Sequence, residues 1–451
     1  MRFIAIMIDS YKEAVSGWVL QTLMILAGLL MIFVIGLSFE PLSPEDDIDR
    51  QLRLITLFTH NDPNAGKAEM GVENFIQTNA PEPYMKGDYK FEAYLRTPSK
   101  EDLDKAREVL DRNQSPFGEK LPPASGEDIV KQYVKDSAPY LQNVTTETVK
   151  SDKPGEVRVK FTTKGTDIDD PLAWKSKPKL FFSWTTGPIF WMSLRQAVYR
   201  VEKTMVNDIG AWLAMLISVV VTAGFIPNML RKGSLDLYIA KPIGRIELLL
   251  YKYVGGLTFV FLLAAFTVGG VWLVVGLRTG VWSPNFLVTI FVLTFYFAIL
   301  YAISTAMAVL TRSTLVAILV TILVWGLVYG IGFAHDTCET INKESKKNFV
   351  KLKKQQGQEG VNPEDAKAVQ PVPEWVENGL YAARKVLPRT YDTDVLSGRL
   401  IAKGVLTDKE MKDKKYDEEP SSDWPEVLIV SFLHIAGLMA LACWRITSRD
   451  G

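Results

Sequence analysis

The sequence is poor in the residue types on which most catalytic and metal sites depend. Its 451 residues include only two cysteines and three histidines. The motifs H-E-x-x-H and G-x-S-x-G, which mark zinc and serine hydrolases, do not occur in it. We therefore expect no catalytic residue, no cofactor and no metal site in this chain.

Net charge and a nucleotide-binding loop are also missing. Lysine and arginine number 51 and aspartate and glutamate also number 51, so the chain shows no excess of the basic charge that nucleic-acid binding requires. The G-x-x-x-x-G-K-[ST] loop, whose backbone amides cradle nucleotide phosphates, is not present. We expect no nucleic-acid partner, and any ATP that drives this protein must be bound by another chain.

Long apolar runs are abundant. A helix of about 20 apolar residues crosses the hydrocarbon of a bilayer, about 30 Å thick. Six runs approach or exceed that length without a single Asp, Glu, Lys or Arg: 17–39, 209–230, 253–277, 286–310, 314–334 and 427–444. The first run exceeds a signal-peptide core and offers no small-x-small cleavage site, so we interpret it as an uncleaved anchor. The predicted fold class is an α-helical polytopic membrane protein with six transmembrane helices.

Charge in the connections predicts the orientation. The hairpin 231–252, between the second and third runs, holds five basic residues against Asp236 and Glu247. Short loops rich in lysine and arginine stay on the cytoplasmic side, and Arg312 in the turn 311–313 follows the same rule. The tail 445–451 and the amino terminus are then cytoplasmic as well. We expect a multi-pass protein of the plasma (inner) membrane.

Two polar insertions lie on the outer side in this topology. Residues 40–188 have the size of a small α+β domain, with helices expected at 99–112 and 126–141 and strands at 157–163 and 180–185. Residues 335–424 form a second, mainly helical insertion, with a solvated helix at 342–358. An amphipathic helix at 375–387 rests on the membrane or on the first insertion. Asp46, Asp47 and Asp49 favour a solvated turn over a Ca²⁺ site.

Two amphipathic segments flank the first insertion and its anchor. Residues 1–16 predict an interfacial helix before the first span, and residues 189–208 predict a linker helix between the first insertion and the second span. In the fifth span, Gly326 and Gly330 form a G-x-x-x-G pair that favours close helix contact. Packing within the chain and packing on a second copy are both open at this point.

The hairpin 231–252 has a pattern of its own. Ser234 can cap a short, partly apolar helix that Pro242 ends, and a new helix begins at Arg245 and runs into the third span. Such a segment suits a lever on which a soluble partner pushes, although an ordinary basic loop remains the alternative. The segment resembles the cytoplasmic coupling region of ABC-2 type transporter permeases. The matching residues are Gly233, Leu235, Leu237, Lys241, Pro242, Arg245, Glu247, Leu249, Lys252 and Gly255.

The resemblance implies a permease subunit of an ATP-driven exporter. It implies a separate ABC ATPase docked on Leu235, Leu237, Ile239, Lys241, Pro242, Arg245 and Glu247, a second identical or related permease, and contact with membrane lipid. The substrate stays unknown. A membrane-anchored scaffold or sensor is one alternative. A secondary transporter is another, although such proteins use ionisable groups or unwound backbone at mid-membrane, and the six runs contain no acidic or basic residue.

Overall fold

The computed structural model describes most of the chain. The described residues are 18–60, 68–78, 87–99, 101–102, 125–151, 153, 155–164, 170–181, 184–185, 192–208, 219–220, 223–224, 227, 244–355, 370–411 and 422–448. The chain divides into two compact units. One unit is Gly36–Ala197, and the other joins the segment up to Ile35 to Val198–Gly451.

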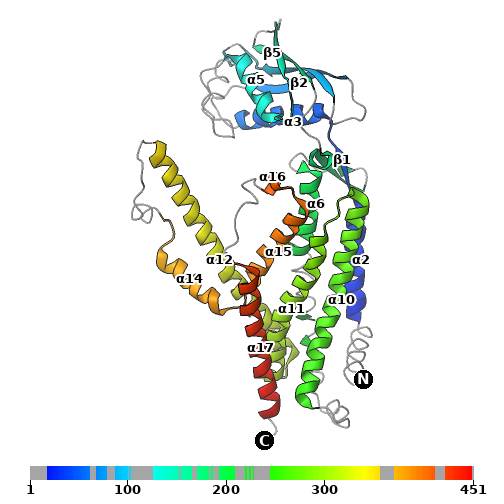
Figure 1. Ribbon diagram of the computed structural model, residues 1–451, viewed down its shortest axis with the longest axis vertical. Coiled ribbons are helices and arrows are strands. Elements are labelled where there is room, and N and C mark those ends of the chain that lie inside the picture. Colours follow the sequence, from blue (N-terminus) through cyan, green and yellow to red (C-terminus); the bar gives the residue numbers. More distant parts are fainter. Residues whose placement is uncertain are drawn as a thin grey trace. The chain divides into compact units, whose positions relative to one another are not determined.

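The larger unit is helical (Figure 1). Its described elements are α2 (Trp18–Gly36), the end of α6 (Leu194–Lys203), the π-helix η3 (Thr204–Asp208), α10 (Arg245–Thr279), α11 (Pro284–Thr311), α12 (Thr314–Gln355), α14 (Glu374–Val386), α15 (Thr390–Val405), α16 (Asp408–Met411) and α17 (Trp424–Ser448). Four of them, α10, α11, α12 and α17, are long and apolar enough to cross a membrane. They cover the predicted third to sixth spans.

The first two predicted spans are described less fully. The first corresponds to α2, which ends at Gly36 because Leu37–Pro41 turn into a strand. The second, 209–230, lies largely outside the described residues, as do the predicted interfacial helix 1–16 and the hairpin up to residue 243. The total of six spans therefore stays a prediction.

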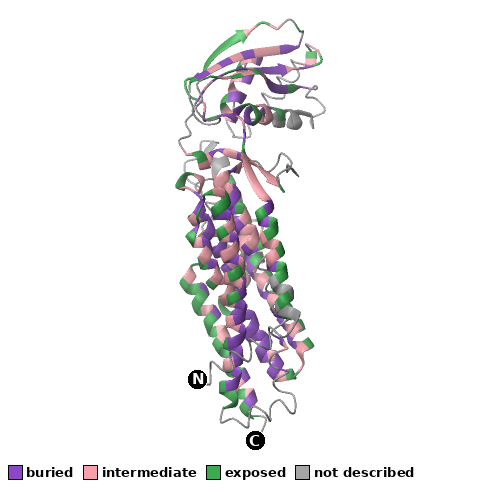
Figure 2. Cartoon of the chain, turned by 90° about the vertical axis from the view of Figure 1, so that its right-hand side faces the viewer, coloured by how far each residue is buried: buried purple, intermediate pink, exposed green. Residues whose placement is uncertain are grey.

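Helix α11 is the centre of the bundle. It packs against α10, α12, α15 and α17. Nearly every side chain from Tyr296 to Val309 is buried, whereas α12 and α17 expose large apolar side chains along one flank. Figure 2 shows this distribution, with buried residues inside the bundle and exposed ones on its surface. Exposed leucine and phenylalanine on long apolar helices indicate surfaces that face lipid.

The unit Gly36–Ala197 combines helices with two antiparallel sheets. A four-stranded antiparallel sheet has the order β2-β3-β5-β4, formed by β2 (Glu69–Thr78), β3 (Asp88–Arg96), β4 (Thr145–Val149) and β5 (Glu156–Lys164). The helices α3 (Pro44–His60) and α5 (Gly126–Ser137) bury Ile48, Leu52, Ile129 and Val130 with inward residues of β3 and β5. A capping box between Ser125 and Asp128 starts α5 where the sequence predicts a helix.

A smaller sheet joins both ends of this unit. It pairs β1 (Leu37–Pro41) with β6 (Lys175–Leu180), and β6 also pairs with β7 (Trp184–Thr185) and β8 (Met192–Ser193). The prediction of one strand over 180–185 is wrong. Phe181 has a positive φ of 49° and ends β6, so the segment turns there. The predicted strand at 157–163 is confirmed as β5.

The prediction of a solvated turn at Asp46, Asp47 and Asp49 is also wrong. These residues lie on α3, whose start follows from Ser43 accepting a hydrogen bond from the Asp46 amide and from Pro44 as the first helical residue. Asp47 is 2% exposed. It pairs with Lys175 at 2.8 Å and accepts a hydrogen bond from the Tyr140 hydroxyl at 2.9 Å.

Helix α12 runs far beyond the predicted fifth span. The expected solvated helix at 342–358 is its direct continuation to Gln355, because neither glycine nor proline interrupts residues 335–355. An ion pair between Glu339 and Lys343 at 2.6 Å, one helical turn apart, supports the polar extension. The fifth span and the second insertion therefore share one helix.

Candidate coupling site and polar seam

The candidate coupling site begins where α10 starts. Gly244 has extended backbone and the first helical residue is Arg245, as the sequence predicts. Arg245 and Glu247 are exposed, and Glu247 lies in the first turn, where the helix dipole favours an acid. The other five predicted coupling residues, Leu235, Leu237, Ile239, Lys241 and Pro242, lie outside the described residues. Their role stays a prediction.

The exposed start of α10 is followed at once by tight packing on α11. The Tyr253 hydroxyl donates a hydrogen bond to the Ala298 carbonyl at 2.8 Å, and its ring stacks on Tyr301 with centroids 5.1 Å apart. A Cβ on Gly256 would lie 2.5 Å from the Tyr301 ring. We call Tyr253, Gly256 and Tyr301 the aromatic lock. It joins α10 to α11 two to three turns after Arg245.

Lys252 belongs to this packed region and not to an exposed loop. The sequence places it at the last position of the hairpin, but it lies within α10 and is 1% exposed. Its neighbour Leu249 is fully buried in the bundle core. The lever that the sequence predicts is thus shorter on the α10 side, where Arg245 and Glu247 are its exposed charged residues among those described.

Three arginines mark one end of the bundle. Arg245 starts α10, Arg312 forms the left-handed cap that ends α11, and Arg445 lies in the last turn of α17. Because α10 runs opposite to α11 and α17, these three positions lie at the same end (Figure 1). We call it the basic end, and we call the other end, where residues 335–424 leave and re-enter the bundle, the insertion end.

At the insertion end α15 is held by polar contacts. The Asn207 side chain of η3 donates a hydrogen bond to the Asp394 carbonyl at 2.6 Å and accepts one from the Ser397 hydroxyl at 3.0 Å. The Tyr329 hydroxyl of α12 donates to the Asp394 carboxylate at 3.3 Å, and the Asn285 amide of α11 to the Leu400 carbonyl at 3.2 Å. We call these contacts the polar seam.

Glu202 is buried beside this seam. Its side chain is 1% exposed and accepts a hydrogen bond from the Ser283 hydroxyl, just before α11 begins. Burial raises the pKa of the Glu202 carboxyl to about 8, although the Ser283 hydrogen bond opposes part of the rise. At neutral pH this acid is therefore largely protonated.

A buried ion network ties α14 and α15 to α12 and α17. The Arg384 guanidinium pairs with Asp392 and lies 2.8 Å from the His335 ring of α12. Arg389 pairs with Asp392 at 3.3 Å and with Glu426 of α17 at 2.6 Å. Both arginine side chains are at most 4% exposed. Paired charges at such burial stabilise only while every partner is present.

Neither the polar seam nor this network was expected from the sequence. A usable signal was present in residues 384–394, where two arginines, one lysine and two aspartates lie around the apolar residues Val386, Leu387 and Tyr391. Buried charge requires a buried partner, so such a cluster between apolar residues predicts contact with a core. Without the structure, their partners on α11, α12 and α17 were not identifiable.

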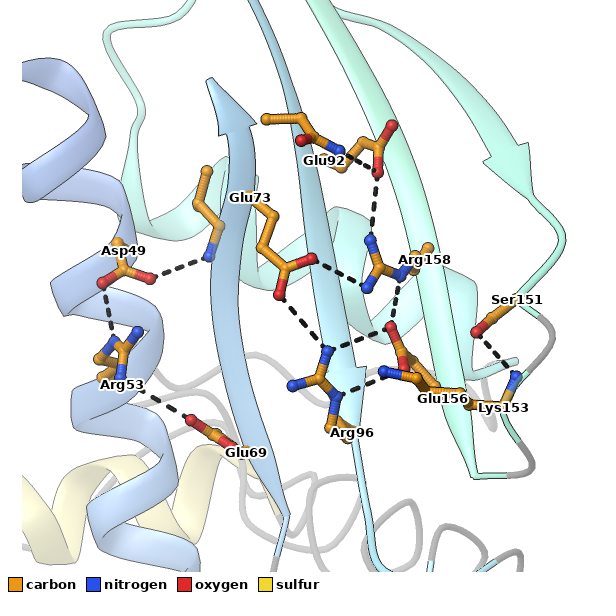
Figure 3. Close-up of polar contacts among 12 residues, drawn as sticks. Asp49, Arg53, Glu69, Glu73, Glu92, Arg96, Ser151, Lys153, Glu156 and Arg158 are labelled. Carbon is orange, nitrogen blue, oxygen red and sulfur yellow. Dashed lines mark hydrogen bonds and ion pairs between the residues drawn. The ribbon is translucent and has the colours of Figure 1, made fainter.

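The unit Gly36–Ala197 also carries a charge cluster, on the face of its larger sheet. Arg158 pairs with Glu73 at 2.9 Å, with Glu92 at 3.3 Å and with Glu156 (Figure 3). Arg96 pairs with Glu156 at 3.3 Å. Burial alone would raise the Glu156 pKa, but hydrogen bonds from Arg96 and Arg158 hold it below its ordinary value. These ion pairs link three strands of the sheet. Within the described residues no group of His, Cys, Asp and Glu could hold a metal ion.

The described residues combine a bundle of apolar helices with a helix whose charged start is exposed. The family model of ABC-2 family transporter proteins matches residues 18–334. The chain belongs to this family. Comparisons with curated proteins and with solved structures gave no match. As an ABC-2 permease, the chain is a transmembrane subunit of a transporter and not the ATPase.

Proposed function

We propose that this permease is the membrane subunit of an ABC exporter driven by a separate ATPase that docks on the hairpin 231–252. The single observation that carries the proposal is the start of α10. There an exposed Arg245 and Glu247 lead within two turns into the buried Leu249 and the aromatic lock. ATPase closure against the hairpin would displace α10 and α11 together.

The same proposal places the basic end in the cytoplasm. Arg245, Arg312 and Arg445 all lie there, as the positive-inside bias requires, and both termini follow them. The membrane is then the plasma (inner) membrane, and the unit Gly36–Ala197 lies outside. Two permease chains, identical or related, would enclose the translocation path. A separate energy source fits a sequence that has no P-loop.

The hairpin variants Leu237→Asp and Arg245→Glu test the coupling role. Leu237→Asp places a charge in an apolar contact, and disruption of such a position costs about 2 kcal/mol or more in binding. Arg245→Glu reverses an exposed charge, with a smaller effect that shrinks as salt rises. We expect both variants to insert normally and to lose ATPase in mild-detergent co-purification, Leu237→Asp more completely.

The control is Arg312→Glu, which makes the same charge reversal at the same end outside the hairpin. It should retain the ATPase. Full retention in both hairpin variants would contradict the proposal. The hairpin would then be an ordinary basic turn. A wild-type chain that co-purifies with no stoichiometric ATPase would favour the scaffold or sensor. Transport that follows the proton gradient alone would favour the secondary transporter.

A further inference from the structure

Helix α14 leaves a second apolar surface exposed. The face that the sequence predicts, with Val376, Leu380, Ala383 and Leu387, is half-buried, and α14 packs against α12. Its other side exposes Trp375 at 77%, Tyr381 at 47% and Val386 at 74%. Lys385 is exposed beside them, with its Nζ 4.6 Å from the centre of the Tyr381 ring.

The contacts of α14 with α12 fix its depth relative to a membrane span. Asn342 of α12 donates a hydrogen bond to Glu377 at 2.8 Å, and His335 contacts Arg384 at 2.8 Å. His335 directly follows the apolar run 314–334, so it marks the edge of the hydrocarbon. With a rise of 1.5 Å per residue, Asn342 lies about 10 Å outside that edge. Helix α14 thus descends toward the hydrocarbon as the chain proceeds.

The turn after α14 lies inside that edge. Leu387, Pro388 and Arg389 line a cavity of roughly one water molecule together with Val328, Ile331 and Gly332 of α12. Val328 lies about 10 Å below His335 along the helix.

A second span independently places this turn inside the apolar layer. The backbone amide of Arg389 donates a hydrogen bond to the Ser431 hydroxyl at 3.1 Å. Ser431 lies four residues, about 6 Å, inside the apolar run 427–444. Two spans therefore place the turn 387–389 within the apolar layer, and Val386 directly precedes it.

We propose that residues 381–386 of α14 are embedded in the lipid leaflet at the insertion end. Val386 contacts acyl chains, and the Tyr381 ring and the Lys385 amine lie at the headgroups, where aromatic and long basic side chains are favoured. The partner of this surface is lipid. An apolar side chain that is three-quarters exposed is stabilised in hydrocarbon and not in water. On the opposite side of the helix, Arg384 is 4% exposed and keeps its ion pair away from the lipid.

The inference does not depend on an ATPase partner, since it uses only the apolar spans and their register with α14. If α14 proves not to contact lipid, the coupling proposal is unaffected. If the hairpin variants keep the ATPase, the lipid contact of α14 is equally unaffected.

Spin labels measure the depth directly. Single cysteines at Trp375, Ala382 and Val386 would be labelled in the full chain, with Cys338 and Cys443 replaced, and reconstituted in phosphatidylcholine–phosphatidylglycerol vesicles. Reference labels at Phe333 and Glu344, both exposed on α12, mark hydrocarbon and water. We expect the ratio of oxygen to nickel-chelate accessibility at Val386 to match Phe333, at Ala382 to be intermediate, and at Trp375 to approach Glu344.

A matched pair of charge variants tests whether lipid contact holds the helix. Val386→Asp, measured with the label at Ala382, should raise nickel-chelate accessibility there, because the buried charge expels the segment. Asn378→Asp, an exposed position nearer the water-facing start of α14, should leave the label unchanged.

Two outcomes would overturn the proposal. A Val386 label as accessible to the nickel chelate as the one at Glu344 would place the segment in water. A Val386 label shielded from both reagents, with spin–spin coupling between chains, would show that a second copy covers this surface instead of lipid.

Discussion

At the basic end, α10 and α11 are joined by stacked rings and a glycine contact, with Tyr253 against Tyr301 and Gly256 beneath that ring. At the insertion end, α15 is joined to η3, α11, α12 and α17 by hydrogen bonds and buried ion pairs. Close apolar packing has a single arrangement and transmits displacement, because interiors are dense and resist compression. The strength of polar contacts depends on which side chains are paired and on whether they are protonated. The difference suits a bundle that is pushed at one end and rearranges at the other.

The largest expected effect comes from breaking the buried ion network. Arg384→Met leaves Asp392 buried with only Arg389 as its cation, and removing one member of a buried pair costs about 3–5 kcal/mol. We expect a clear fall in the thermal unfolding midpoint in detergent. The double variant Arg384→Met/Asp392→Leu removes both charges and should recover part of the loss. A double variant no more stable than the single one would show that packing and not charge pairing holds this turn.

The next largest effect is expected at the aromatic lock near the basic end. Gly256→Leu forces a side chain into the Tyr301 ring, and overpacking of this kind costs about 1–3 kcal/mol. The matched control is Gly269→Leu on the same helix, where a Cβ would meet nothing within 4 Å among the described residues. We expect lower stability and weaker ATPase stimulation for Gly256→Leu only. Equal behaviour of the two variants would mean that the aromatic lock is dispensable.

The sequence predicts the apolar framework well for a physical reason. Spans must satisfy their backbone polar groups internally, so long apolar runs admit little besides helices. The helices α11 and α17 match their runs within four residues. Helix α10 begins at Arg245, after Gly244, and continues through the third run, as the sequence predicts. The sequence becomes polar after residue 334, which suggests the end of a helix, but residues 335–355 still favour helix. Helix α12 therefore continues to Gln355.

The insertion end was beyond sequence reasoning because its contacts are long-range. Asn207 meets Asp394, and Arg389 meets Glu426, only through the folded arrangement of five elements. A charged segment between apolar residues reads equally well as a solvated connection. The coupling residues are the reverse case, since the sequence names all seven and the described structure includes two of them, Arg245 and Glu247.

Protonation offers a further test at the insertion end. The Glu202 pKa rises from its ordinary 4.5 to about 8 in the folded chain, so between these values the folded state binds more protons than the unfolded state. Stability must therefore fall as pH rises through this window, by at most about 1.4 kcal/mol per pH unit. Thermal unfolding from pH 5 to 8 should show the slope, and Glu202→Gln should flatten it. An unchanged slope in Glu202→Gln would assign the pH dependence to other groups.

The smallest effect on the isolated chain is expected at Gly326 and Gly330. A Cβ at either position would meet nothing within 4 Å among the described residues, so neither glycine is needed for packing within that part of the chain. Gly326→Leu and Gly330→Leu should change the stability of the isolated chain by no more than about 0.5 kcal/mol. Because G-x-x-x-G pairs allow close approach of two helices, we expect both variants to weaken self-association in native gels.

The control on the same helix is Gly332→Leu, where a Cβ would lie 2.6 Å from Tyr391 and should destabilise the fold itself. Wild-type assembly in both Gly326→Leu and Gly330→Leu would leave this face of α12 to lipid, and the second permease copy would have to pack elsewhere on the bundle.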